Sequence, residues 1–210
     1  MNTALKNKNL QKVTFIKHWT ENLFSFRIQR PASFKFRSGE FVMIGLPNQD
    51  GKPILRAYSI ASPSWSEELE FYSIIVEDGP LTSRLKNIIV NDEIILMPKP
   101  TGTLVLDALK PGKRLFLLSS GTGFAPFSSL IREPETFEKF EKVIVTHTCR
   151  TVKELKYSQD VINDALSDEM ISEFISNKLI FYHSTTREDY INKGRITDLI
   201  TSHKLFKDLN

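Results

Sequence analysis

The sequence predicts two domains: an antiparallel β-barrel, followed by an α/β domain built on a parallel sheet. Short apolar or alternating runs, separated by turn residues, recur through the first hundred residues. From about Lys110 onward, continuous apolar runs alternate with helical patterns. A chain of 210 residues is long enough for two small domains. The Pro111-Gly112 pair marks the junction, and we expect domains at residues 1–107 and 108–210.

The first domain is expected to contain six strands, because regularly spaced short strands are typical of a barrel. These strands are predicted at residues 13–16, 23–28, 41–46, 57–60, 69–76 and 93–97. The turn signals between them are Ser38-Gly39, Pro47-Asn48, Asp50-Gly51, Asp78-Gly79 and Asn91-Asp92. Residues 81–89 carry apolar side chains at helical spacing, so we expect one helix in this half.

The second domain is expected to alternate strands and helices. Apolar strands are predicted at residues 114–119, 142–148 and 178–182. A Gly-rich turn and a helix follow the first of these strands. Residues 161–177 have a helical pattern that Ser167-Asp168-Glu169 interrupts. This alternation predicts a parallel sheet.

Composition excludes several classes of protein. Cys149 is the single cysteine, so an internal disulfide and a Cys-ligated iron–sulfur cluster are both excluded. The four histidines lack metal-ligand spacing, and each is expected to be a surface or packing residue. No apolar run approaches the roughly 20 residues that span a bilayer, and the N-terminus has no signal-peptide core. We therefore expect a cytoplasmic monomer with no metal, membrane or nucleic-acid partner.

A first candidate binding motif is Arg56-Ala57-Tyr58-Ser59, on a predicted strand. An arginine presents a planar fork of donors to phosphate groups, while a tyrosine offers a flat ring for stacking. Alternation places Arg56 and Tyr58 on one face of the strand. Taken alone, the motif is better explained by a plain strand that carries a surface arginine and a half-buried tyrosine.

A second motif, Gly79-Pro80-Leu81-Thr82-Ser83, opens the predicted helix of this half. Free backbone N–H groups at a helix start, together with two hydroxyls, form a phosphate site. The same hydroxyl residues are also common helix caps. The two interpretations, a phosphate site and a helix cap, are compatible because a phosphate would bind at the cap position.

A third motif, Ser120-Gly121-Thr122-Gly123-Phe124-Ala125-Pro126, lies between a strand and a helix. Glycines such as Gly121 and Gly123 let a backbone approach a pyrophosphate closely, and Pro126 suits a first helical turn. The pattern is GxGxxP and not the dinucleotide fingerprint GxGxxG. A plain strand-to-helix connection remains the alternative.

Three arginines follow the predicted strands of the second domain: Arg150, Arg187 and Arg195. Loops after the carboxyl ends of parallel strands form the ligand crevice of such sheets. Arg150 and Arg187 should therefore converge on one edge. Arginine clusters bind phosphate monoesters, although any single loop arginine is usually only a surface residue.

These motifs together resemble the bacterial ferredoxin–NADP reductases. The segment RAYSIASPSWSEELEFYSIIVEDGPLTSRL is similar to the flavin-binding signature of that family, and the resemblance continues through KPTGTLVLD and LLSSGTGFAPF. It covers nearly the whole chain. It implies an FAD-binding β-barrel domain, an NADP-binding α/β domain, and an enzyme that transfers electrons between NADP(H) and ferredoxin or flavodoxin.

The resemblance also implies roles for individual residues. Ser59 would hydrogen-bond near the reactive flavin N5 and is the one catalytic candidate. The other implied FAD contacts are Arg56, Ala57, Tyr58, Tyr72, Ile74, Val76, Pro80, Leu81, Thr82 and Ser83. The implied NADP contacts are Gly121, Thr122, Gly123, Arg150, Thr186, Arg187 and Arg195, with Thr186, Arg187 and Arg195 at the 2′-phosphate.

Two other functions share some of these motifs. One is the reductase component of an oxygenase, or a free flavin reductase. The absence of cluster cysteines and the segments GPLTSRL and TRE…GR favour the ferredoxin type. The other is a non-catalytic flavin-binding electron-transfer module. Family members continue beyond the segment that matches residues 194–210, so we expect that the family's C-terminal segment is missing here.

Overall fold

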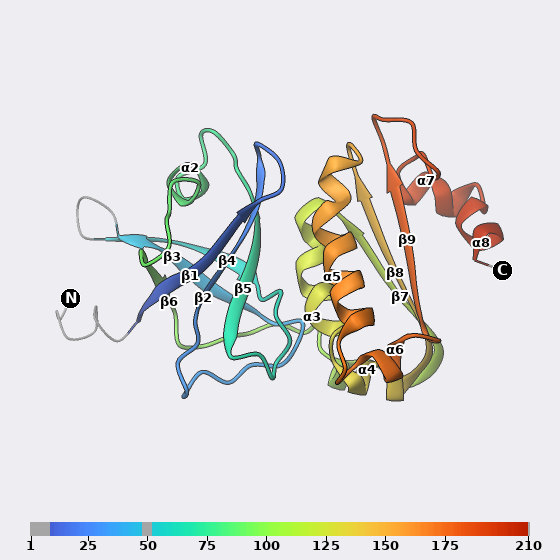
Figure 1. Ribbon diagram of the computed structural model, residues 1–210, viewed down its shortest axis with the longest axis horizontal. Helices are drawn as coiled ribbons and strands as arrows, with labels where there is room; N and C mark the ends of the chain where they lie inside the picture. The colour runs from blue at the N-terminus through green and yellow to red at the C-terminus, as the bar shows by residue number, and fades with distance from the viewer. Residues whose placement is uncertain (1–8, 48–51, 210) are drawn as a thin grey trace. The chain divides into compact units, whose positions relative to one another are not determined.

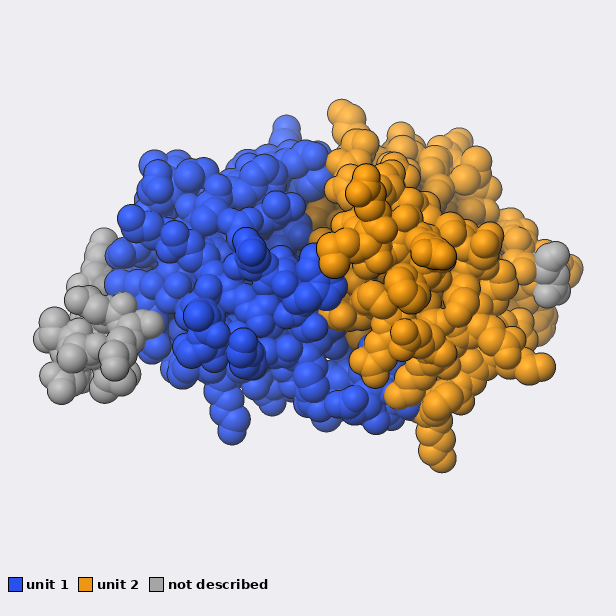
Figure 2. Space-filling model, turned by 60° about the horizontal axis from the view of Figure 1, so that its bottom comes forward, with its two compact units in different colours: residues 1–109 blue, residues 110–210 orange. Residues whose placement is uncertain are grey.

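The computed structural model describes residues 9–47 and 52–209. The chain divides into two compact units, residues 1–109 and residues 110–210 (Figure 2). The turns predicted at Pro47-Asn48 and Asp50-Gly51 fall wholly or partly outside the described residues. Each unit is described by itself below.

Unit 1 contains the six predicted strands in one antiparallel sheet. They are β1 (Leu10–His18), β2 (Leu23–Gln29), β3 (Phe41–Pro47), β4 (Pro53–Ser59), β5 (Glu68–Ile74) and β6 (Glu93–Leu96). Their order across the sheet is β4-β3-β6-β1-β2-β5. The strand predicted at residues 57–60 begins earlier, at Pro53, because the whole segment pairs with β3 from Pro47↔Pro53 to Phe41↔Ser59.

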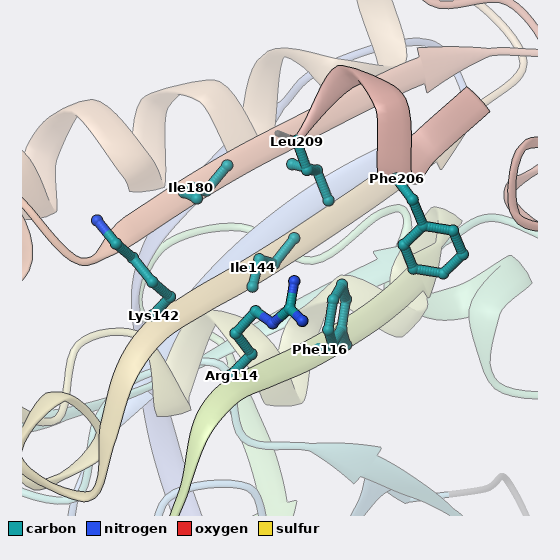
Figure 3. A pocket seen from close by; sticks show the side chains of 7 residues that line it. All are labelled: Arg114, Phe116, Lys142, Ile144, Ile180, Phe206 and Leu209. Carbon is teal, nitrogen blue, oxygen red and sulfur yellow. The ribbon is translucent and has the colours of Figure 1, made fainter. Parts of the chain in front are cut away.

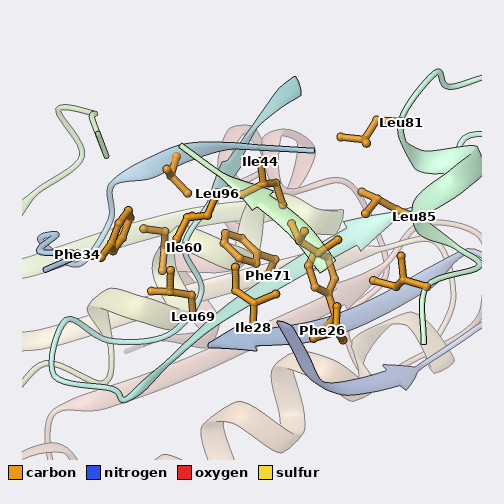
Figure 4. Close-up of a cluster of buried hydrophobic side chains, with 14 of the residues drawn as sticks. Phe26, Ile28, Phe34, Ile44, Ile60, Leu69, Phe71, Leu81, Leu85 and Leu96 are labelled. Carbon is orange, nitrogen blue, oxygen red and sulfur yellow. The ribbon is translucent and has the colours of Figure 1, made fainter. Parts of the chain in front are cut away.

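The sheet of unit 1 closes on itself next to the residues after β4. The N–H of Ala61 donates to the carbonyl of Glu70 in β5 at 2.8 Å, which links the first and last strands of the sheet order. The enclosed core is aromatic and aliphatic, with Phe26, Phe71 and Ile44 fully buried (Figure 4). Side chains on one face of each strand fill this core because successive residues of a strand point to opposite faces. The predicted barrel is confirmed.

The helix predicted at residues 81–89 is much shorter in the structure. Only α2 (Thr82–Leu85) is helical, followed by turns up to Asn91, whose φ of 78° lies in the left-handed region. Leu81, Leu85 and Ile88 are buried against the barrel core. The apolar spacing that predicted a helix therefore reflects this packing, which a single turn and the residues around it are sufficient to provide.

Unit 2 is built on a three-stranded parallel sheet with the order β7-β8-β9. The strands are β7 (Gly112–Ser120), β8 (Phe140–Cys149) and β9 (Leu179–Thr185). Every residue of β8 from Val143 to Cys149 is buried. This strand is the central one, and other parts of the unit cover both of its faces. Continuous apolar runs are typical of such strands. The predicted parallel α/β sheet is confirmed.

Helices lie on both faces of this sheet, with α3 and α5 on one face and α7 and α8 on the other (Figure 1). The helices of unit 2 are α3 (Ala125–Leu130), α4 (Pro134–Lys139), α5 (Lys156–Ser167), α6 (Ser172–Ile175), α7 (Ile196–Thr201) and α8 (Lys204–Asp208). The interruption predicted at residues 167–169 is confirmed, because α5 ends at Ser167 and α6 starts at Ser172. The sequence analysis missed α4, α7 and α8, which have at most six residues each.

Candidate functional site

The tyrosine of the first motif lies near the end of β4 and has a fixed orientation. The Tyr58 hydroxyl lies 3.0 Å from the Ser73 hydroxyl on β5. Its ring meets the ring of Phe71 edge-on, with centroids 6.2 Å apart and planes at 88°. Burial raises the pKa of Tyr58, and the hydrogen bond with Ser73 acts in the opposite direction. Ser73 and Phe71 thus hold the ring in place, a role that the sequence analysis did not identify.

The residues beside Tyr58 differ in how much of them reaches the surface. Arg56 is exposed, and its Nη1 donates to the carbonyl of Leu55 at 2.8 Å. Ala57 is exposed and Ser59 is half-buried. To turn toward an anion, the guanidinium of Arg56 has to break only this exposed hydrogen bond. Such a bond contributes little to the stability of the fold.

The three candidates that follow along β5 do not share one environment. Tyr72 is buried, while Ile74 and Val76 are 38% and 51% exposed. Val76 lies beyond the end of β5, which stops at Ile74. Alternation places Tyr72 and Ile74 on one face of the strand, with Ser73 on the other. Two exposed aliphatic side chains remain there for contact with a planar ligand.

The turn that includes Gly79 and Pro80 is organised by the Thr82 side chain. The Thr82 hydroxyl accepts from the N–H of Val76 at 3.2 Å and donates to the carbonyl of Val76 at 3.1 Å. A Cβ on Gly79 would lie 2.3 Å from Thr82 Oγ1, so a larger residue here would displace the Thr82 side chain. The turn thus uses the proton of the Thr82 hydroxyl, and its predicted contact with a phosphate stays a prediction.

Two backbone donors remain in that turn. Ser83 donates its N–H to the carbonyl of Gly79 at 3.1 Å, whereas the N–H groups of Leu81 and Thr82 donate to no atom among the described residues. With only four residues, α2 contributes little dipole field. Donors for an anion are thus these two N–H groups and the Ser83 hydroxyl.

The Gly-rich motif of unit 2 forms a 3₁₀ turn, η2 (Gly121–Phe124), between β7 and α3. Gly121 has a φ of 51°, a conformation that favours glycine. Gly123 has no such requirement, and a Cβ added at either position would meet nothing within 4 Å. The glycine at Gly123 is therefore not explained by packing or backbone conformation. The absence of a side chain at Gly123 leaves space in which a ligand can approach the backbone closely.

A buried histidine on the neighbouring strand contacts this turn. His147 Nε2 lies 2.9 Å from the carbonyl oxygen of Gly121, and Nδ1 lies 2.6 Å from the hydroxyl of Ser158 on α5. The Cys149 thiol lies 3.2 Å from Nε2. Burial lowers the pKa of His147 to about 4, and the bond to Gly121 opposes that shift. His147 was expected to be a surface or packing residue; it is buried, but it is also tied to the candidate site.

The loops after β8 and β9 are joined by backbone and carboxylate hydrogen bonds. The N–H of Arg187 donates to the carbonyl of Arg150 at 2.9 Å. Glu188 accepts from the N–H of Val152 at 2.7 Å, and Glu154 accepts from the N–H of Arg150 at 2.8 Å. Arg150 and Arg187 thus lie in adjacent loops at the carboxyl edge of the sheet, where the sequence placed them.

Arg195 belongs to the same edge. The N–H of Gly194 donates to the carbonyl of Thr185 at 2.8 Å, which brings Arg195 next to the segment that carries Thr186 and Arg187. Arg195 directly precedes α7. All three guanidinium groups are exposed, and within residues 9–47 and 52–209 none of them forms an ion pair or a side-chain hydrogen bond. Three unpaired cations in linked loops are an arrangement typical of sites for anions.

A separate hollow of about 130 Å³ contains none of the predicted residues. It lies on the sheet face that carries α8 (Figure 3). Its lining residues are Arg114, Phe116, Lys142, Ile144, Ile180, Phe206 and Leu209. Sites for small molecules have about 300–1,000 Å³, so this hollow is too small for a dinucleotide.

Comparison with known proteins identifies the family. Residues 8–106 match the family model of the oxidoreductase FAD-binding domain. A flavodoxin/ferredoxin–NADP reductase of Rhodobacter capsulatus is 60% identical over 199 residues, which are 95% of this chain and 74% of that relative. The chain belongs to the ferredoxin–NADP reductase family. The resemblance seen in the motifs is thereby confirmed.

Further members of the ferredoxin–NADP reductase family agree. The ferredoxin–NADP reductase of Azotobacter vinelandii is 50% identical over 205 residues, which are 98% of this chain and 79% of that relative. The crystal structure of a ferredoxin–NADP⁺ reductase from Neisseria gonorrhoeae, with bound FAD and NADP, has a TM-score of 0.85 and 28% identity. The match covers 95% of this chain and 78% of that one.

Two further structural observations concern metals and membranes. Among the residues that the structure describes, no three or more His, Cys, Asp or Glu side chains are grouped as metal ligands would be. The helices in the same residues are too short or too polar to cross a bilayer.

Proposed function

We propose that this chain is an FAD-dependent ferredoxin–NADP reductase that transfers electrons between NADP(H) and a separate ferredoxin or flavodoxin. One observation carries the proposal most directly. Unit 2 combines a Gly-rich turn facing open space with three exposed, unpaired guanidinium groups in linked loops. A pyrophosphate and an additional phosphate monoester match these two features.

FAD is proposed to bind unit 1. The Tyr58 ring would stack on the isoalloxazine, since Ser73 and Phe71 already fix its orientation. The free N–H groups of Leu81 and Thr82, with the guanidinium of Arg56, would hold the phosphates. Ala57, Tyr72, Ile74, Val76, Pro80 and Ser83 complete the proposed set of FAD contacts.

NADP(H) is proposed to bind unit 2. The backbone of Gly121, Thr122 and Gly123 would receive the pyrophosphate and nicotinamide ribose. Thr186, Arg187 and Arg195 would bind the 2′-phosphate, and Arg150 would contact the nucleotide phosphates. The 2′-phosphate is a dianion near neutral pH, and bidentate arginine contacts favour it over the ribose hydroxyl of NAD.

The bound flavin would supply the ability to exchange electrons singly and in pairs, which links a hydride donor to a one-electron carrier. The chain supplies binding and orientation. Ser59 is proposed as the one residue whose hydroxyl acts at the reacting flavin atoms, as a hydrogen-bond donor or acceptor. Tyr58 would exclude water from the flavin ring through its aromatic face.

The electron partner is proposed from the family. Relatives of this chain are named as reductases of ferredoxin or of flavodoxin and ferredoxin. The single cysteine of the chain cannot hold a cluster, so the one-electron carrier would be another protein. We propose that the reductase itself acts as a monomer.

Anaerobic stopped-flow mixing tests the proposal. The purified, FAD-loaded chain is mixed with NADPH or with NADH, and reduction is followed at the flavin absorbance. Fast bleaching by NADPH and slow bleaching by NADH are expected, followed by electron delivery to added ferredoxin. A flavin that neither nucleotide reduces would contradict the proposal and support a non-catalytic flavin module. Equal reduction by NADH would favour an oxygenase reductase or a flavin reductase.

A further inference from the structure

His147 is the buried titratable group with the most direct contact to the candidate nucleotide site. Its Nε2 lies 2.9 Å from the carbonyl oxygen of Gly121, and its ring lies against the ring of Phe124 with centroids 4.9 Å apart. Gly121 and Phe124 are the first and last residues of η2. One side chain of β8 thus contacts both ends of the Gly-rich turn.

The hydrogen-bonding partners of His147 determine which ring nitrogen carries the proton. The carbonyl of Gly121 only accepts, so its 2.9 Å contact with Nε2 is a hydrogen bond when Nε2 carries the proton, and the Cys149 sulfur, 3.2 Å from Nε2, is then a second, weak acceptor. The imidazole is neutral near pH 7, since burial lowers the pKa of His147 to about 4. In that tautomer Nδ1 carries no hydrogen and accepts from the Ser158 hydroxyl at 2.6 Å, in competition with the carbonyl of Leu155. That hydroxyl also lies 2.8 Å from the carbonyl of Leu155, so its one proton serves two acceptors.

Peptide geometry transmits this contact to the surface. A trans peptide is planar, with its C=O and N–H pointing in opposite directions, and the described residues contain no cis peptide. The carbonyl of Gly121 points inward to His147, so the N–H of Thr122 in the same peptide plane points outward. That N–H donates to no atom among the described residues, and a Cβ at Gly121 or Gly123 would meet only open space.

The N–H of Gly121 is directed inward as well. Burial raises the pKa of the Cys149 thiol to about 12, as does the charge of Glu154, while a backbone hydrogen bond from Gly121 acts in the opposite direction. Both peptide planes around Gly121 are therefore held by side chains of β8. A glycine with φ of 51° is otherwise free to move between conformations.

We propose that His147 is a positioning residue for nucleotide binding: its Nε2–H holds the carbonyl of Gly121 inward and so directs the Thr122 N–H toward the bound NADP(H). This inference rests on the proposed function, since it assigns a ligand to the outward N–H. In this proposal the neutral imidazole of His147 is a hydrogen-bond donor to the Gly-rich turn, and the contact with Ser158 fixes the orientation of the imidazole. The residue touches neither coenzyme nor reacting atoms and acts only through the turn.

His147→Phe is the informative variant, because it retains a ring against Phe124 and removes the hydrogen bond. Loss of one hydrogen bond corresponds to roughly tenfold in affinity, so the Kd for NADP⁺ by calorimetry should rise about tenfold. Reduction of the flavin by NADPH should slow more than affinity explains, since a displacement of about 1 Å costs ~100-fold in rate. His147→Gln, whose amide N–H reaches toward the same carbonyl, should recover most of both losses.

Val145→Ala is the matched control. Val145 is fully buried two residues earlier on β8 and shares its face with His147. The variant should lower stability while leaving the Kd and the rate unchanged. If His147→Phe behaves as wild type, or if Gln fails to rescue and Val145→Ala loses binding in parallel, the positioning role is refuted.

Two measurements keep the test independent of coenzyme turnover. Nitrogen-15 NMR of the FAD-loaded chain should show His147 as the Nε2–H tautomer, and the Nδ1–H tautomer would overturn the proposal even if the Phe variant does not fold. Amide hydrogen exchange without nucleotide should accelerate at residues 121–124 in His147→Phe and not in Val145→Ala. Wild-type protein that NADPH fails to reduce would contradict the proposed function instead, and these two measurements would still decide the arrangement of the turn.

Discussion

The neutral imidazole of His147 should make the stability of unit 2 fall on mild acidification. The pKa of His147 is about 4 in the folded chain and about 6.5 in an unfolded one. The unfolded state therefore takes up a proton first as the pH falls, and stability is lost from about pH 6.5 downward until the loss levels off below about pH 4. At about 1.4 kcal/mol per pH unit, the loss between pH 7 and pH 5 is about 2 kcal/mol.

The two units provide separate probes for this experiment. Both tryptophans of the chain, Trp19 and Trp65, belong to unit 1. Every described α-helix except α2 belongs to unit 2. Urea unfolding followed by far-ultraviolet circular dichroism thus reports mainly on unit 2, while tryptophan fluorescence reports on unit 1.

His147→Gln should remove most of this pH dependence when each variant is compared with its own value at pH 7. Burial also lowers the pKa of His183, so that residue contributes in the same direction, and His183→Gln serves as the control that retains the contribution of His147. A His147→Gln protein whose stability in unit 2 falls between pH 7 and pH 5 as steeply as wild type would refute the assignment of a buried, neutral imidazole.

Three further predictions concern the binding surfaces. Replacing Arg187 and Arg195 by Ala should weaken NADPH binding roughly tenfold or more per arginine, since charged hydrogen bonds contribute about 1.5–3 kcal/mol each; equal losses for NADH in the same titration would contradict a role at the 2′-phosphate. Tyr58→Ala should lose FAD during gel filtration and shift the flavin spectrum. Tyr58→Phe, which loses only the bond to Ser73, should lose about 1 kcal/mol of FAD-binding free energy at most. Wild-type FAD retention in both variants would exclude stacking. Gly123→Ala should leave the melting temperature of the nucleotide-free chain nearly unchanged, because the new Cβ meets nothing within 4 Å, yet weaken NADP⁺ binding in calorimetry; unchanged affinity would show that the coenzyme does not approach this position.

The sequence predicted the strands well because their signals are local. All nine predicted strands are present, with ends that differ by a few residues. Period-two alternation in unit 1 and continuous apolar runs in unit 2 follow directly from burial on one or both faces. The helix at residues 81–89 was wrong in length because side chains packed beneath a loop can imitate helical spacing, as Leu85 and Ile88 do.

The supporting residues of the site were not accessible to the same reasoning. Ser73 meets Tyr58, and His147 meets Gly121, through contacts between segments separated by 15 and 26 positions. Neither separation carries a sequence signal. Thr82 was predicted as a phosphate contact from its residue type, and its hydrogen bonds within the turn could not be predicted in the same way.

The linkage between the loops after β8 and β9 separates architecture from specificity. Backbone groups and the carboxylates of Glu154 and Glu188 hold these loops, and the arginine side chains take no part. The side chains of Arg150 and Arg187 therefore do not stabilise these loops, so either residue can be replaced without changing the loop structure. Substitutions at these exposed arginines should therefore change coenzyme preference, in evolution or by design, while Glu154 and Glu188 keep the loops in place.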